Sequence, residues 1–172
     1  LNNIRTNYAN MVSRGRLRQE DMDKRIALIR ATSTWEDLAQ DDLVIEAVYE
    51  NMEAKQEVFR ALSTHTKRDC ILASNTSTLS IDEIASATTR PQDVIGTHYF
   101  SPANVMKLLE VVRGAQTAKD VLATVMALAK KIKKTAVVEV ISSGSSLVHF
   151  HRQLLEEEEE KNRQVPTTVS IQ

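Results

Sequence analysis

The sequence predicts an α/β fold built on a mostly parallel sheet. Five short apolar runs are rich in β-branched residues, which is typical of strands buried in a parallel sheet. Helical patterns separate most of these runs, and such alternation favours the α/β class. The length of 172 residues suits one domain, and a hydrophobic fraction of 42% can supply its core.

The expected elements follow in order along the chain. Residues 1–29 predict helix interrupted at Gly15, because Leu1, Ile4 and Tyr8 recur at the spacing of one helix face. We expect further helices at 51–63, from about 81, and at 117–133, and strands at 42–48, 70–74, 94–98, 108–112 and 136–141. Residues 142–172 include five glutamates in a row, and here we expect a helical segment and then a disordered tail.

The composition excludes several kinds of partner. A net charge of −1 gives no electrostatic case for binding nucleic acid or a membrane surface. Apolar runs such as 43–48 are too short to span a bilayer. The one cysteine, Cys70, fits a reducing compartment and is expected to pack as a small apolar residue. No Cys/His spacing fits a zinc site, so no metal site is expected.

Ligands of open parallel sheets bind beyond the carboxyl ends of the strands, and His98 is the sharpest candidate there. It ends a predicted strand, and histidine exchanges a proton near neutral pH. Glu110, twelve residues later in the next strand, could orient the ring. The alternative is a packed histidine beside an unrelated buried glutamate, which position alone favours.

Two other strand ends carry polar side chains. Ser74, Asn75, Thr76 and Ser77 could orient a substrate oxygen, or they could be the N-cap of a helix, which position alone favours. Glu46 lies in an apolar run, so it needs a partner if it is buried, or it faces water at the strand end.

Four segments stand in order: DLVIEAVYE at 42–50, ASNTSTL at 73–79, GTHYFSP at 96–102 and VMKLLEVV at 105–112. Together they resemble the 3-hydroxyacyl-CoA dehydrogenase family of fatty-acid β-oxidation. Four ordered segments are far more specific than one, and the resemblance covers roughly residues 1–138.

The resemblance implies NAD-dependent oxidation of L-3-hydroxyacyl-CoA to 3-ketoacyl-CoA. By it, His98 is the general base, Glu110 orients His98, and Ser77 hydrogen-bonds the substrate oxygen. The residues implied at the NAD site are Ala47, Glu50, Lys55 and Asn75. The implied partner is an acyl-CoA, and the full-length family implies a homo-oligomer. The compartment would be the cytoplasm in a bacterium, and the peroxisome or mitochondrion in a eukaryote.

The sequence departs from the family pattern at both ends. Its four glycines, at 15, 96, 114 and 144, cannot form the Gly-x-Gly-x-x-Gly turn that places a pyrophosphate at a helix N-terminus. Near Val148 the family has an active-site asparagine. The sequence changes abruptly after Val138, as a frameshift, an alternative reading or an artificial junction would produce. By the resemblance, we also expect these residues to lack the family's helical substrate and dimerisation domain.

The resemblance therefore implies an incomplete Rossmann-like, doubly wound sheet that lacks its first two strands. Residues 1–141 would form a partial NAD-binding domain, followed by the divergent residues 142–172. The run at 43–48 then either pairs directly with 71–74 or leaves sheet edges exposed, and we expect weak stability of the chain in isolation. Two functional alternatives stay open, a short-chain 3-hydroxybutyryl-CoA dehydrogenase and a catalytically inactive remnant.

Overall fold

The computed structural model describes residues 1–140, which form two compact units with a division after Asp37. The prediction of an acidic helical tail at 142–172, and the comparison made at Val148, lie outside these residues.

The first unit, Leu1–Asp37, is helical as predicted. It contains α1 (Asn2–Ser13) and α2 (Gln19–Ala27), and the short 3-10 helix η1 (Trp35–Leu38) crosses its boundary. Gly15 lies in the turn after α1 with a φ of 66°, a left-handed conformation that glycine adopts without steric cost. Gly15 therefore ends α1, as the interrupted pattern predicts.

The second unit contains a five-stranded sheet in the order β1-β2-β3-β4-β5. The strands are β1 (Leu43–Glu46), β2 (Ile71–Ser74), β3 (Val94–Tyr99), β4 (Leu108–Arg113) and β5 (Thr135–Val140). The helices are α3 (Met52–His65), α4 (Ile81–Ser86) and α5 (Lys119–Lys131), with the 3-10 helix η2 (Pro91–Asp93) before β3. All five strands coincide with the predicted runs.

Three of the four strand pairings are parallel, and only β3 and β4 run antiparallel. The prediction of a mostly parallel α/β sheet is therefore confirmed. β1 pairs directly with β2. The alternative in which the run at 43–48 pairs with 71–74 is therefore correct. Within residues 1–140 no strand lies on the outer edge of β1.

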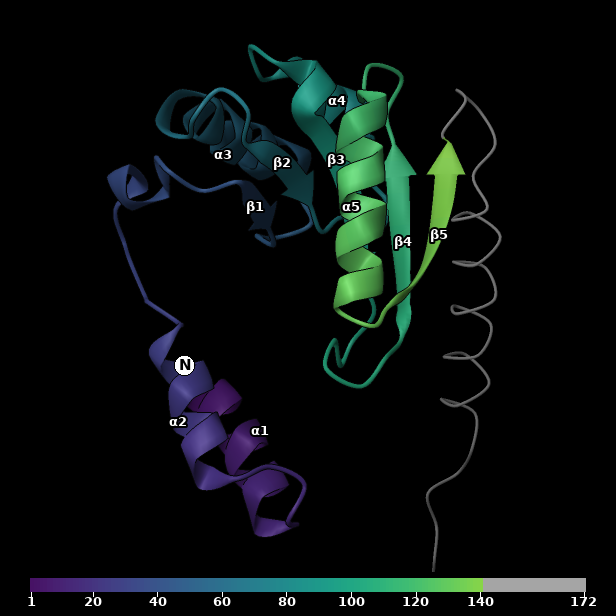
Figure 1. Cartoon of the computed structure of the whole chain (residues 1–172). Coiled ribbons are helices and arrows are strands. Elements are labelled where there is room, and N and C mark those ends of the chain that lie inside the picture. The colour runs from purple at the N-terminus through teal and green to yellow at the C-terminus, as the bar shows by residue number, and fades with distance from the viewer. Residues whose placement is uncertain (141–172) are drawn as a thin grey trace, which may run out of the picture. The chain divides into compact units, whose positions relative to one another are not determined.

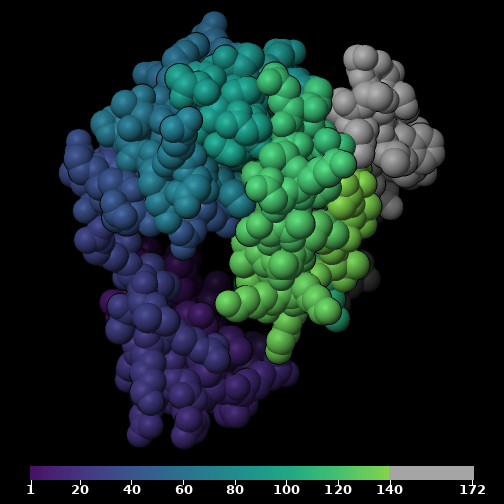
Figure 2. All heavy atoms as spheres, turned by 45° about the horizontal axis from the view of Figure 1, so that its top comes forward, coloured from purple at the N-terminus to yellow at the C-terminus, as the bar shows by residue number. Residues whose placement is uncertain are grey.

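Helices cover both faces of the sheet, which is the doubly wound arrangement. Consecutive residues of β2 show it, because Leu72 packs in the core with α3 and α4, whereas Ile71 and Ala73 pack in the core with α5. Figure 1 shows α5 lying across one face of the sheet. In Figure 2 the green atoms of α5 form a continuous surface, with the atoms of β5 beyond them.

Side chains at the helix starts explain where α3 and α4 begin. The side chain of Asn51 accepts a hydrogen bond from the Ala54 backbone N–H and caps α3. Ser80 caps α4 in the same way, through the N–H of Glu83. The interpretation of residues 74–77 as a helix N-cap is therefore wrong.

Candidate active site

The carboxyl ends of β1, β2 and β3 lie at one edge of the sheet because the three strands are parallel. These strands end at Glu46, Ser74 and Tyr99. The segments selected from the sequence lie at these ends or directly after them, and β4 begins at the same edge, because it runs antiparallel to β3. The fold therefore presents the candidate residues at the edge where ligands of such sheets bind.

His98 and Glu110 lie opposite each other in the β3–β4 pairing. The distance from Nδ1 of His98 to Oε2 of Glu110 is 2.7 Å, and the two side chains are 20% and 13% exposed. An ionised carboxylate only accepts hydrogen bonds, so Nδ1 donates, and the lone pair of Nε2 is the one available to another molecule. The Phe100 ring lies 4.5 Å from the His98 ring, centre to centre. The antiparallel register thus produces a histidine held by a carboxylate.

A second cluster forms around Glu50, just after β1. Its Oε1 lies 2.6 Å from Thr76 Oγ1, 2.9 Å from the N–H nitrogen of Ser77 and 3.1 Å from that of Thr78. Burial raises the pKa of Glu50, but these hydrogen bonds and the charge of Lys55 outweigh it and lower the pKa to about 2. Glu50 is therefore an anion at neutral pH.

Lys55 lies beneath this cluster with a side chain that is 0% exposed. Its Nζ donates to both carboxylate oxygens of Glu46, at 2.9 and 3.1 Å, and lies 3.5 Å from Oε2 of Glu50. The Ser74 hydroxyl donates to the second Glu46 oxygen at 2.7 Å. Glu46 is therefore a buried carboxylate with partners rather than a strand end facing water.

Asn75 joins the ends of β2 and β3. Its Oδ1 accepts a hydrogen bond of 2.8 Å from the Tyr99 backbone N–H, next to His98 in the chain. Ala47 is exposed directly after β1. The structure thus pairs His98 with Glu110, and it gathers Glu50 with Lys55 and the turn at 76–78.

Sequence reasoning found Glu46 unusual but did not identify its partners. The missed signal was the position of Lys55 in α3, four residues before Phe59 and seven before Leu62. Those three residues share one helix face, and Phe59 and Leu62 are core residues. A lysine on an inward face and a carboxylate in an apolar strand each need a partner of opposite charge.

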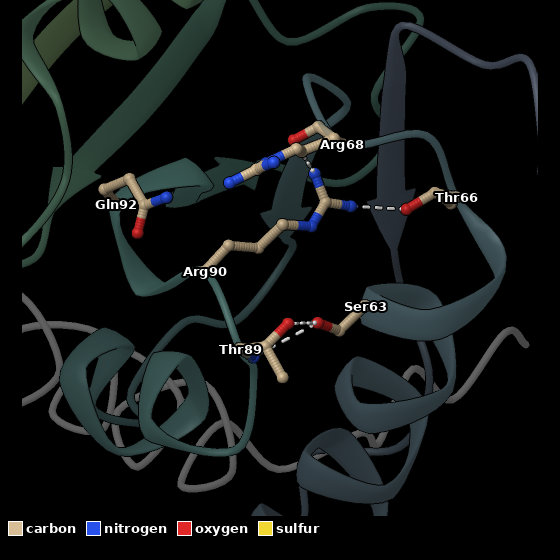
Figure 3. A pocket seen from close by; sticks show the side chains of 6 residues that line it. All are labelled: Ser63, Thr66, Arg68, Thr89, Arg90 and Gln92. Carbon is tan, nitrogen blue, oxygen red and sulfur yellow. Dashed lines mark hydrogen bonds between the residues drawn. The ribbon is translucent and has the colours of Figure 1, made fainter.

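A pocket of about 430 Å³ lies elsewhere, close to the amino ends of β2 and β3 (Figure 3). It is lined by Ser63, Thr66, Arg68, Thr89, Arg90 and Gln92. The Arg90 guanidinium donates to the backbone oxygens of Arg68 and Cys70, and Thr89 hydrogen-bonds Ser63. Arg90 therefore links the segment before β3 to the segment before β2. Cys70 is fully buried in the core, as predicted.

In the described part of the chain, no three His, Cys, Asp or Glu side chains are grouped so that they could hold a metal ion. No helix within residues 1–140 is long and apolar enough to cross a bilayer.

Comparison with known proteins identifies the family. The family model described as "3-hydroxyacyl-CoA dehydrogenase, NAD binding domain" matches residues 1–141. The chain belongs to this family. The resemblance inferred from four sequence segments is thus confirmed.

The curated relatives of this chain are much longer proteins. The human peroxisomal bifunctional enzyme is 55% identical over 109 residues, which are 63% of this chain and 15% of that protein. The fatty acid oxidation complex subunit alpha of Psychrobacter cryohalolentis is 44% identical over 128 residues, or 74% of this chain and 18% of that protein. The chain therefore spans less than a fifth of these relatives.

Solved structures of dehydrogenases share the fold. The 3-hydroxybutyryl-CoA dehydrogenase of Escherichia coli K12 matches with a TM-score of 0.84 and 32% identity, over 96% of this chain and 35% of that one. The (S)-3-hydroxybutyryl-CoA dehydrogenase of Ralstonia eutropha gives 0.82 and 31%, over 88% and 54%. The Rossmann-like interpretation of the sheet is confirmed.

Proposed function

We propose that this chain contributes to the NAD-dependent oxidation of L-3-hydroxyacyl-CoA to 3-ketoacyl-CoA in fatty-acid β-oxidation. The observation that carries the proposal is the pair of His98 and Glu110 at the carboxyl edge of the sheet, with 2.7 Å between Nδ1 and Oε2. Family membership supplies the reaction class. The names of the relatives supply the pathway and the acyl-CoA substrate.

In this mechanism His98 is the general base. Its Nε2 takes the proton of the 3-hydroxyl group, while the hydrogen on the same carbon leaves as hydride. Glu110 holds the ring through Nδ1 and stabilises the positive charge that develops on the imidazole. Ser77 is a hydrogen-bonding partner for the substrate oxygen. NAD, when bound, supplies the acceptor for the hydride.

The residues at this edge fit part of a dinucleotide site. Ala47 is exposed after β1, the Glu50 side chain is 37% exposed, and Asn75 and Ser77 are partly exposed after β2. They offer small side chains and polar groups at the strand ends where such cofactors bind. Lys55 would act on a cofactor only through its neighbours, because it is fully buried. The glycine turn that would hold the pyrophosphate does not occur in this sequence.

A second candidate is a chain with no catalytic activity of its own. The 172 residues include no Gly-x-Gly-x-x-Gly turn, so by themselves they lack the phosphate-binding N–H groups that such a turn supplies. For the compartment, the guinea pig and human relatives are named as peroxisomal, which favours the peroxisome for a eukaryotic source. The cytoplasm remains our proposal for a bacterial source.

The test is NADH oxidation with acetoacetyl-CoA by the purified chain. General base catalysis contributes roughly 10²- to 10⁴-fold, so His98→Ala should lower the rate by that factor. His65→Ala is the matched control, because His65 lies in the last turn of α3. Turnover that survives His98→Ala would contradict the assigned base. No turnover with the unaltered chain would favour the second candidate.

A further inference from the structure

One oxygen of the Glu50 carboxylate is surrounded by the turn that carries Ser77. Besides the three contacts given above, Oε1 lies 3.2 Å from Ser77 Oγ and 3.3 Å from Thr78 Oγ1. Two backbone N–H groups and three hydroxyl groups from three consecutive residues thus converge on a single atom. The carboxylate therefore determines the conformation of this turn.

Two further hydrogen bonds, nearer the sheet, join residues 46–50 to residues 74–78. The side chain of Ser74 donates to Glu46, and the backbone N–H of Asn75 donates to the Glu46 carbonyl at 2.8 Å. Residues 46–50 therefore hold residues 74–78 at both ends. Ser77 cannot shift relative to β1 unless several of these hydrogen bonds break.

Lys55 contacts the second carboxylate oxygen of Glu50. Its Nζ is 3.5 Å from Oε2 and is itself held by the two oxygens of Glu46, with the Val48 carbonyl also 3.5 Å away. Because Lys55 is fully buried, it would have to leave these partners to contact a bound molecule. The lysine therefore orients Glu50 from inside the protein.

We propose that Glu50 is a positioning residue for Ser77, and that Lys55 acts through Glu50. The proposal rests on the proposed function, because Ser77 is assigned there to the substrate oxygen. The Ser77 hydroxyl is bound to Glu50 at 3.2 Å, a longer distance than the 2.9 Å of the Ser77 backbone N–H. The hydroxyl can thus turn to a substrate while the N–H keeps the turn in place.

The first test is amide hydrogen exchange in the full chain, followed by NMR. Glu50→Ala should speed exchange at the Ser77 and Thr78 amides by about tenfold, since each loses its charged acceptor. Glu50→Gln should restore part of the protection, because an amide oxygen also accepts. Glu57→Ala is the matched control on the exposed face of α3 and should leave both rates unchanged. Equal rates in Glu50→Ala and the unaltered chain would overturn the proposal.

The second test asks whether Glu50 acts through Ser77. We would measure kcat/KM for acetoacetyl-CoA with NADH in a double-mutant cycle of Glu50→Ala and Ser77→Ala. Glu50→Ala should reduce the value about tenfold when Ser77 is present and less than about threefold in the Ser77→Ala background. An equal reduction in both backgrounds would show that Glu50 acts independently of Ser77, through the cofactor site or the fold, and would overturn the proposal.

The two tests separate this proposal from the proposed function. If the unaltered chain gives no turnover, the proposed function fails in its own assay. The exchange rates of Ser77 and Thr78 then still decide whether Glu50 holds the turn.

Discussion

Replacing Lys55 by methionine should destabilise the protein more than any surface change. Methionine keeps most of the side-chain length but removes the charge that faces Glu46 at 2.9 and 3.1 Å. At an effective dielectric constant of about 20, one such pair attracts with roughly 6 kcal/mol before desolvation is subtracted. Glu46, only 4% exposed, would remain as a buried carboxylate without its cation. Removing one partner of a buried pair typically costs about 3 to 5 kcal/mol, which we expect here.

The assay is urea unfolding of the full chain at pH 7. A domain is stable by only about 5 to 15 kcal/mol, and urea slopes are about 1 to 3 kcal/mol per molar, so the midpoint should fall by about 1 M or more. Arg60→Met is the control, because Arg60 is exposed on the same helix, and it should change stability by less than about 0.5 kcal/mol.

A second variant isolates the charge effect. Glu46→Gln, added to Lys55→Met, removes the remaining buried charge. The glutamine oxygen can still accept from the Val48 N–H, and its NH2 group can donate to the Ser74 hydroxyl. The double variant should recover more than half of the lost stability, since both charges are then absent. A loss below about 1 kcal/mol for Lys55→Met, or no recovery in the double variant, would refute this reasoning.

Three further predictions concern single residues. Gly96→Ala should cost about 1 to 3 kcal/mol, because its Cβ would lie 2.8 Å from Val112 Cβ and 2.9 Å from Ile81 Cδ1, as urea unfolding can measure. Thr97→Val should be neutral or raise Tm, because the buried Thr97 hydroxyl has no hydrogen-bond partner within residues 1–140. Glu50→Gln should cost about 1 kcal/mol at pH 7, a value reduced for its partial exposure. Because folding lowers the pKa of Glu50 from 4.5 to about 2, this difference should be present above pH 4.5 and vanish as the pH falls to 2. A difference that persists unchanged at pH 2 would contradict that assignment.

Much of the fold could be predicted because the strands are apolar runs bounded by polar turns. The antiparallel pairing of β3 and β4 was not predicted, although the sequence carried a signal for it. Only residues 100–107 separate these strands, and they form no helix, whereas a parallel connection usually needs a crossover of a dozen or more residues. That pairing brings Glu110 opposite His98, so the topology of one connection creates the candidate catalytic pair.

The candidate site was only partly predictable, because it depends on register. Glu46 lies opposite Ser74 in the β1–β2 pairing, and the segments that follow each strand therefore meet. A shift of this register would separate Glu50 from the turn at 76–78, yet no pattern in either segment specifies it. His98 and Glu110 could be named from their positions and from the family resemblance, whereas the arrangement around Glu50 required the structure.

Three carboxylates of this domain contact basic side chains, and their surroundings determine what each can do. Glu46 and Lys55 are sealed in the interior, where changing the charge of either would leave the other unpaired, so their pair serves as scaffold. Glu110 and His98 remain partly exposed at the sheet edge, so a proton can move between the imidazole and an incoming molecule while Nδ1 stays bound. Glu50, whose side chain is 37% exposed, contacts both regions: its Oε2 faces the buried lysine and its Oε1 holds the turn with Ser77. The buried charge of Lys55 is therefore connected, through Glu50, to Ser77, the residue assigned to the substrate oxygen.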